Sequence, residues 1–237
     1  MRGFARGLAA LVLIAASSTA ARAQATIPVP PSCPVSTCVA PLASSQLENL
    51  GRLKAEIKTY YTNGAYAAET ATIEHDAAGY LRRRVAAHVT HPAIVLDIDD
   101  TALSTFGYEA EHDFGYDAAS WNAAARRGFP AIPATLALTR AAHRAGVTVF
   151  FITGRRTPQK SLTAANLRAD GYAFTALYMR PVADHDKSVV PFKSGTRAAI
   201  ERAGYHILET VGDQWSDLKG GHAERAYKLP NPMYYLP

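Results

Sequence analysis

The sequence lacks an apolar run long enough to form a permanent membrane anchor. Its apolar stretch near the start, Leu8–Ala16, is shorter than the roughly 20 residues that a membrane-spanning helix needs. Arg2 and Arg6 precede this stretch, and Ala21–Ala23 follows it as a small-x-small cleavage site. This order is typical of a signal peptide over residues 1–23, which predicts export to the periplasm or the cell exterior.

Cysteine is also scarce, because Cys33 and Cys38 are the two cysteines of the whole chain. Both lie in a proline- and serine-rich arm, residues 24–42, for which we expect irregular structure. Two close cysteines in an exported chain favour a small disulfide loop. A metal pair is the alternative, but no further cysteine or nearby histidine completes such a site. Neither cysteine directly follows the apolar run, so no lipid anchor is expected.

The chain has little excess charge once the leader is set aside. Its formal net charge is +5, from 25 basic and 20 acidic residues. The leader holds three of the arginines and no acid, which leaves 22 basic residues against 20 acidic ones, or a net charge of +2. Proteins that bind nucleic-acid polymers need a concentrated basic face, so no such partner is expected.

Strands and helices are predicted to alternate over one globular domain, residues 43–237. An N-terminal helical segment is expected over residues 43–90, with a cap at Ser44 or Ser45 and a break at Asn63–Gly64. Strands are then expected at 94–96, 147–152, 176–179, 205–211 and 226–229, and helices at 132–145, 158–169, 191–203 and 215–219. This alternation predicts an α/β fold with a Rossmann-like, doubly wound parallel sheet. Residues 102–130, aromatic and irregular, are expected to form a small cap-like insertion.

The first predicted strand runs straight into a cluster of acids. Ile94–Leu96 is apolar with two β-branched residues among three, as expected of a buried parallel strand, and Asp97, Asp99 and Asp100 follow it. An unpaired buried charge is costly, so the chain must leave the sheet near Asp97. Carboxyl ends of strands are where ligands bind in open α/β sheets. The alternative is a helix N-cap made from the Asp99-Asp100-Thr101 turn.

Two later strands end in polar residues as well. Thr153 and Gly154 follow the second strand, and Asp213 and Asp217 follow the fourth. Lys193 lies at the start of a predicted helix and can point to the same edge, although a lysine taken alone is more often a surface residue. Because the carboxyl ends of parallel strands share one edge, these residues are expected to meet Asp97 there.

The residue types at this edge suit phosphate chemistry. Carboxylates are preferred ligands of Mg2+, and a hydroxyl, backbone N–H groups and a lysine suit phosphate oxygens. Asp97 is then a candidate nucleophile that forms an aspartyl-phosphate. Asp99 can protonate the leaving alcohol and later accept a proton from water.

The sequence resembles the haloacid-dehalogenase (HAD) superfamily of phosphohydrolases, and within it the subfamily IIIB acid phosphatases. This branch includes plant vegetative-storage-type proteins and bacterial class C acid phosphatases. The resemblance is carried by Asp97–Thr101, Phe151–Arg155, Phe192–Ser194, Gly212–Leu218 and Lys228–Tyr235. It covers about Ser44 to Pro237, nearly all of the mature chain.

The resemblance implies a role for each matched residue. The Mg2+ ligands would be Asp97, Asp99 (through its backbone carbonyl), Asp213 and, directly or in support, Asp217. Asp97 would also be the nucleophile and Asp99 the general acid and base. Thr153 and Lys193, with Gly154 allowing close approach, would hold the phosphate. Homodimers are frequent among such relatives, so a homodimer is an open expectation.

We therefore expect an exported, Mg2+-dependent acid phosphatase that acts on small-molecule phosphomonoesters. Four aromatic residues could line a pocket and stack on the base of a 5′-nucleotide, or could equally pack in the core: Phe106, Tyr108, Trp121 and Trp215. Two alternatives stay open. One is a catalytically weak storage or binding protein on the same scaffold, and the other is phosphotransfer to an alcohol through the same intermediate.

Overall fold

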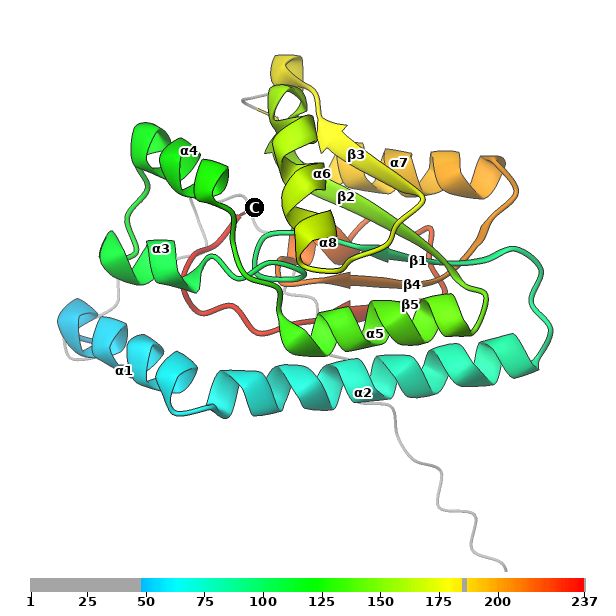
Figure 1. Cartoon of the computed structure of the whole chain (residues 1–237), viewed down its shortest axis with the longest axis horizontal. Helices are drawn as coiled ribbons and strands as arrows, with labels where there is room; N and C mark the ends of the chain where they lie inside the picture. Colours follow the sequence, from blue (N-terminus) through cyan, green and yellow to red (C-terminus); the bar gives the residue numbers. More distant parts are fainter. Residues whose placement is uncertain (1–47, 185–186, 237) are drawn as a thin grey trace, which may run out of the picture. The chain divides into compact units, whose positions relative to one another are not determined.

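The computed structural model describes residues 48–184 and 187–236 (Figure 1). The expected signal peptide, the arm and the Cys33–Cys38 pair lie outside these residues. The first helix, α1 (Leu50–Thr62), begins later than the sequence predicted. Asn49 rather than Ser44 or Ser45 is its N-cap, because the side chain of Asn49 accepts a hydrogen bond from Arg52 N at 3.2 Å.

Five parallel strands form the sheet in the order β3-β2-β1-β4-β5. The strands are β1 (Pro92–Leu96), β2 (Thr148–Arg156), β3 (Ala176–Arg180), β4 (His206–Gly212) and β5 (Arg225–Lys228). The chain builds outward from β1 through β2 to β3 and then crosses to β4 on the other side. The strand order therefore reverses beside β1, which is the position of the ligand crevice in doubly wound sheets.

Helices cover both faces of the sheet, which confirms the α/β fold that the sequence predicted. The main helices are α2 (Ala65–Ala86), α5 (Pro133–Arg144), α6 (Lys160–Ala169) and α7 (Val190–Arg202). Figure 1 shows α7 on one face and α2 with α5 on the other. Alternate strand residues serve the two faces, as a pleated strand requires. Val149 and Phe151 pack with the α2, α5 and α6 side, whereas Phe150 and Ile152 pack with Ile200 of α7.

The insertion after β1 is more regular than the sequence indicated. It contains two short helices, α3 (Phe106–Glu111) and α4 (Ala118–Arg127). The side chain of Asp117 caps α4 by accepting a hydrogen bond from Ser120 N at 2.7 Å. Strand β2 also continues past Ile152, with an irregularity in its pairing between Thr153 and Arg156. None of the helices described here is both long and apolar enough to cross a bilayer.

Two glutamate side chains that are not among the predicted site residues are buried. Glu209 of β4 and Glu74 of α2 are almost fully buried. Neither oxygen of Glu209 and only one of Glu74 has a hydrogen-bond partner among the described residues. Burial raises the pKa of Glu209 to about 8 and that of Glu74 to about 7, from an ordinary value of 4.5.

We expect Glu209 to make the protein less stable as the pH rises. Between pH 4.5 and about 8 the folded chain keeps a proton on Glu209 that the unfolded chain releases, so the free energy of unfolding falls across this window. The Glu209→Gln variant has no titrating group at this position. Its free energy of unfolding should therefore fall less than that of the wild type over this pH window, by on the order of a few kcal/mol. Thermal melts of both proteins from pH 4.5 to 8.5 measure this difference. Parallel curves would contradict the prediction.

Candidate active site

Asp97 lies where β1 leaves the sheet. Its backbone N–H still donates to Val211 O of β4 at 3.0 Å. The carbonyl of Ile98 then accepts hydrogen bonds from Thr101 N, Ala102 N and Leu103 N, so the chain turns sharply at once. Asp97 is thereby held at the carboxyl edge beside β4, as the sequence predicted.

Three carboxylates and one ammonium meet at this position. Asp97, Asp213 and Asp217 are buried, and each offers an oxygen within 4.8 Å of the others. Asp213 follows β4, and Asp217 lies in the short helix α8 (Trp215–Leu218). Lys193 of α7 donates to Asp97 Oδ1 at 2.6 Å and to Asp217 Oδ1. The helix α7 thus brings to the cluster the lysine that the sequence placed there.

The cluster holds more negative than positive charge. Burial raises the pKa of Asp97 well above its ordinary value; Lys193 opposes this rise, and the charge of Asp217 adds to it. Burial and the charge of Asp217 raise the pKa of Asp213 to about 6. Burial alone would lower the pKa of Lys193, but Asp217 and Asp97 raise it above its ordinary value. Lys193 offsets one of three carboxylate charges, so repulsion remains.

These residues fit a divalent cation. Three convergent carboxylate oxygens are the hard donors that Mg2+ and similar ions prefer, and a bound cation would remove the repulsion. The carboxylate of Asp213 is also oriented as metal ligands usually are. Its Oδ1 accepts from Thr101 Oγ1 at 2.9 Å, and its Oδ2 accepts from Gln214 Nε2 at 2.7 Å and from Asn231 Nδ2 at 2.8 Å.

Gly212 is required for this geometry. A Cβ atom at Gly212 would lie 2.3 Å from Cβ of Asp217, a distance that real Cβ atoms do not reach. We expect Gly212→Ala to displace Asp217, which would destabilise the fold by about 1–3 kcal/mol and slow turnover about 10²-fold. Melting curves and steady-state rates measure both effects. Gly195→Ala in α7, where an added Cβ meets nothing within 4 Å, is the matched control and should leave both unchanged.

Thr153 and Gly154 lie on β2, next to β1 in the sheet. Thr153 is buried, and its hydroxyl accepts a hydrogen bond from Arg155 N at 3.1 Å. Gly154 is exposed, and a Cβ there would meet no protein atom within 4 Å. The space beside Gly154 is therefore open to a ligand.

Asp99 is held by a residue that the sequence did not single out. Its side chain is outside the three-carboxylate group and instead accepts from Arg155 Nη2 at 2.6 Å and Nε at 3.0 Å. The guanidinium of Arg155 lies over Trp121 and Phe129, with its carbon 5.2 and 5.5 Å from their ring centroids. The insertion thus supports the arginine that orients Asp99.

Asp100 and Thr101 shape the turn. Asp100 has a φ of +52°, and its carboxylate accepts from Thr105 N at 2.9 Å and from Tyr234 OH at 2.8 Å. Burial and the charge of Asp213 raise the pKa of Asp100 to about 8. Asp100 therefore fixes the backbone next to Asp97.

The four aromatic residues proposed for a pocket have different surroundings. Phe106 stacks on Tyr61 of α1 with ring centroids 4.4 Å apart. Tyr108 is buried, and its hydroxyl donates to Asp117 O at 3.2 Å within the insertion. Trp121 lies against Arg155, as described above. Trp215 is 44% exposed at the start of α8. Of the four, Trp121 is therefore the one that lies against the arginine bound to Asp99, and Trp215 is the one that is exposed.

Several residues of the site escaped sequence reasoning. They are polar side chains that donate a hydrogen bond to an acid of the site: Thr101, Arg155, Gln214, Asn231 and Tyr234. All five lie within the sequence strings that carry the resemblance to acid phosphatases. Those strings were a usable signal, but they did not indicate which acid each residue contacts.

Comparisons with known proteins show the family to which the chain belongs. The family model described as "HAD superfamily, subfamily IIIB (Acid phosphatase)" matches residues 43–237. Acid phosphatase 1 of Solanum lycopersicum is 32% identical over 186 residues, which cover 76% of this chain and 73% of that protein. Vegetative storage protein 1 of Arabidopsis thaliana is 29% identical over 205 residues, which cover 82% and 76%.

The fold also matches a solved structure. The class C acid phosphatase of Bacillus anthracis superposes with a TM-score of 0.66 at 21% identity, over 78% of this chain and 86% of that one. This structural likeness supports the fold alone. The family assignment is supported by the family model and by the similarity to acid phosphatase 1 of Solanum lycopersicum. The chain belongs to the acid phosphatases of HAD superfamily subfamily IIIB.

Proposed function

We propose that this phosphatase is an exported, Mg2+-dependent phosphomonoesterase that works through an aspartyl-phosphate on Asp97. The observation that carries the proposal is the buried cluster in which Lys193 joins Asp97 to Asp217 beside Asp213. The cluster lies at the point where the strand order reverses. Export rests on the leader-like residues 1–23 of the sequence.

In the first step a carboxylate oxygen of Asp97 attacks the phosphorus of the ester. The bond between phosphorus and the ester oxygen breaks, and the departing oxygen takes a proton from Asp99. Thr153 and the backbone at Gly154 contact the phosphate, and Lys193 neutralises part of its charge. A bound Mg2+ would supply further neutralisation of the charge that develops on the phosphoryl oxygens.

In the second step water replaces Asp97. Asp99, now a carboxylate, accepts a proton from the water as its oxygen attacks the phosphorus, and the bond to Asp97 breaks to release phosphate. In this structure Arg155 donates to both oxygens of Asp99, so the carboxyl group must turn away from Arg155 to reach the departing oxygen. Substrate binding is therefore expected to draw Arg155 or Asp99 out of this pair.

The proposed substrates are small phosphomonoesters, with 5′-nucleotides as a specific candidate. Trp121 and Trp215 are the aromatic residues available to stack on a base. This candidate predicts faster turnover of 5′-nucleotides than of glycerol phosphate. Equal rates would remove it without affecting the chemistry proposed for Asp97.

A storage or binding protein on this scaffold is the second candidate, favoured by the likeness to a vegetative storage protein. Hydrolysis of a chromogenic aryl phosphate separates the two. We expect turnover that stops with EDTA and returns with added Mg2+. Turnover that survives EDTA would overturn the metal-dependent mechanism, and metal-loaded protein that binds phosphate without turnover would favour storage. Added nucleoside as acceptor would reveal phosphotransfer.

A further inference from the structure

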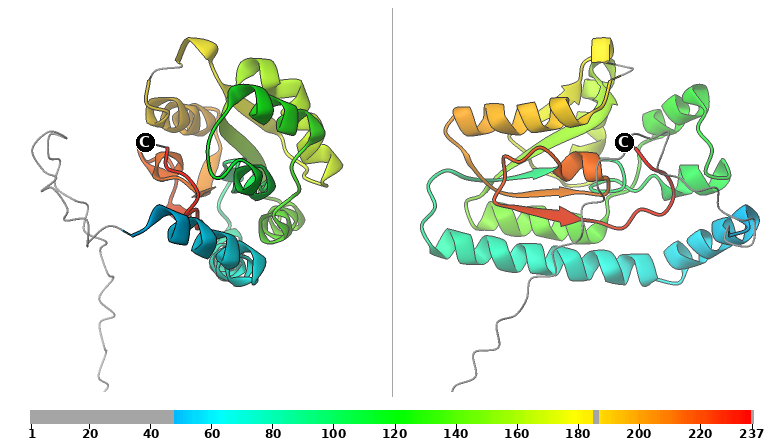
Figure 2. Two further views of the ribbon diagram at one scale, coloured as in Figure 1. Left: turned by 90° about the vertical axis from the view of Figure 1, so that its left-hand side faces the viewer. Right: turned by 180° about the vertical axis from the view of Figure 1, so that it is seen from behind.

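We propose that the C-terminal segment, residues 229–236, is a positioning element of the metal centre, in which Asn231 orients the carboxylate of Asp213. The inference rests on the proposed function, because it assigns Asp213 to the binding of a divalent cation. It extends that function to a segment that lies beyond the last strand. Figure 2 shows this segment, in red, running from β5 past α8 toward the end of the sheet that carries α3.

Both ends of the segment form hydrogen bonds with the residues that flank Asp213. Leu229 N donates to Gly212 O at 2.9 Å, directly before Asp213. Leu236 N donates to Gln214 Oε1 at 3.0 Å, directly after it. The side chains of Leu229 and Met233 are buried as well. The segment therefore spans the loop that presents Asp213.

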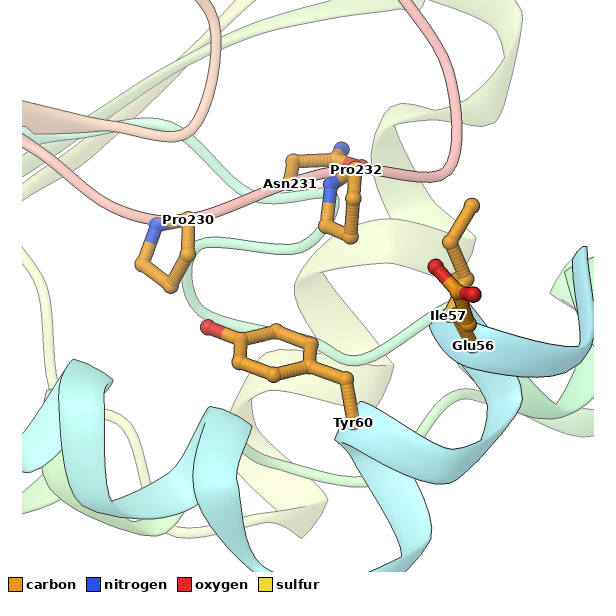
Figure 3. A pocket seen from close by; sticks show the side chains of 6 residues that line it. All are labelled: Glu56, Ile57, Tyr60, Pro230, Asn231 and Pro232. Carbon is orange, nitrogen blue, oxygen red and sulfur yellow. The ribbon is translucent and has the colours of Figure 1, made fainter. Parts of the chain in front are cut away.

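Asn231 lies in the middle of this span and uses both ends of its amide. Its Nδ2 donates to Asp213 Oδ2 at 2.8 Å, and its Oδ1 accepts from Met233 N at 2.9 Å. Pro230 and Pro232 flank it and restrict the backbone on either side. Figure 3 shows their rings on the side of the segment that faces Tyr60 of α1. Asn231 is thus held through both ends of its side-chain amide and by the two prolines that flank it.

Tyr234 extends the same segment to the loop after β1. Its hydroxyl donates to Asp100 Oδ2 at 2.8 Å, on the turn that follows Asp97. One short segment therefore contacts both loops that supply the cluster, one through Asn231 and the other through Tyr234. This arrangement keeps Asp213 and Asp97 in register with each other.

The contact to Asp213 has a direct consequence for metal binding. A carboxylate that accepts fixed hydrogen bonds is already oriented when the cation arrives, so less freedom is lost on binding. Removing such a partner typically weakens metal affinity by about 10–100-fold. A segment that merely packed on the core would lower stability and leave the metal affinity unchanged.

Two substitutions of Asn231 separate these possibilities. Asn231→Asp keeps the acceptor for Met233 N but replaces the donor with an oxygen that repels Asp213. Asn231→Ser keeps a local acceptor and adds no charge, but its hydroxyl is too short to reach Asp213. Tyr235→Phe is the control, because Tyr235 lies four residues after Asn231 and is 67% exposed. All are made in the full chain.

Calorimetric titration with Mg2+, and melting curves with and without it, provide readouts besides activity. We expect both Asn231 variants to raise the Kd for Mg2+ about 10-fold or more, with the metal requirement of turnover shifted equally. The metal-free melting temperature of Asn231→Ser should stay close to that of the wild type, whereas that of Asn231→Asp should be lower because of the added repulsion. Tyr235→Phe should match the wild type throughout. Unchanged Kd values in both Asn231 variants overturn the inference alone. A wild-type protein that binds no divalent cation overturns the proposed function as well.

Discussion

Replacing Asp97 with asparagine is expected to reduce hydrolysis of phosphate esters by about 10⁴-fold or more, as loss of a covalent nucleophile usually does. The amide has nearly the same shape as the carboxylate, so the surrounding contacts can persist. It is a poor nucleophile and cannot carry the phosphoryl group between the two steps. Steady-state rates with an aryl phosphate at saturating Mg2+ measure the loss.

The loss in Asp97→Asn should not come from unfolding. Burial disfavours the charged form of Asp97, and its pKa is raised accordingly. A neutral side chain at this position should therefore leave the metal-free protein at least as stable as the wild type. Asp76→Asn, on the exposed side of α2, is the control and should keep full activity. An Asp97→Asn protein that melts normally and still turns over substrate would exclude Asp97 as the nucleophile.

Replacing Lys193 with methionine is expected to damage both stability and rate. Asp97 and Asp217, both buried, would lose the ammonium that they share. Removing one partner of a buried ion pair costs about 3–5 kcal/mol, because the remaining charge is uncompensated. In addition, the loss of the ammonium group beside the phosphate should slow turnover about 10²-fold. Chemical denaturation and rate measurements quantify the two effects separately.

Added Mg2+ distinguishes the origin of the Lys193→Met effect. If repulsion among the three carboxylates destabilises the variant, Mg2+ should raise its melting temperature more than that of the wild type. Lys187→Met is the control, because Lys187 pairs with Asp184 at the surface. It should change neither property. A Lys193→Met protein as stable as the wild type without metal would mean that Lys193 does not balance this cluster.

The sheet could be predicted because its signals are local. The apolar run before Asp97 and the alternation of strands and helices were enough to give the fold class and the face at which the acids meet. The predicted start of α1 was wrong. Leu47 extends the apolar spacing toward the N-terminus, but the helix begins at Leu50, because the side chain of Asn49 caps it. Helix α3 was missed because its 6 residues are too few to show a periodic pattern, whereas the alanine-rich α4 carried a helical signal that the aromatic character of the stretch obscured.

The site was predictable where strand ends determine it. Asp97, Asp213 and Asp217 were expected to converge because each follows a strand of one parallel sheet, and the structure brings them together. Arg155 and Asn231 were not predicted as partners of acids. Their contacts depend on tertiary packing and have no periodic signal: Arg155 is 56 residues from Asp99, and Asn231 is 18 from Asp213.

The central claim is that Asp97 carries the phosphoryl group during turnover. Quenching the working enzyme with borohydride tests it most directly, because this reagent reduces the acyl phosphate of an aspartate to homoserine, which peptide mass spectrometry locates. We expect homoserine at position 97 in the presence of substrate and Mg2+, and none when either is left out. If the enzyme turns over substrate while position 97 stays unmodified and another residue is reduced, Asp97 does not carry the phosphoryl group.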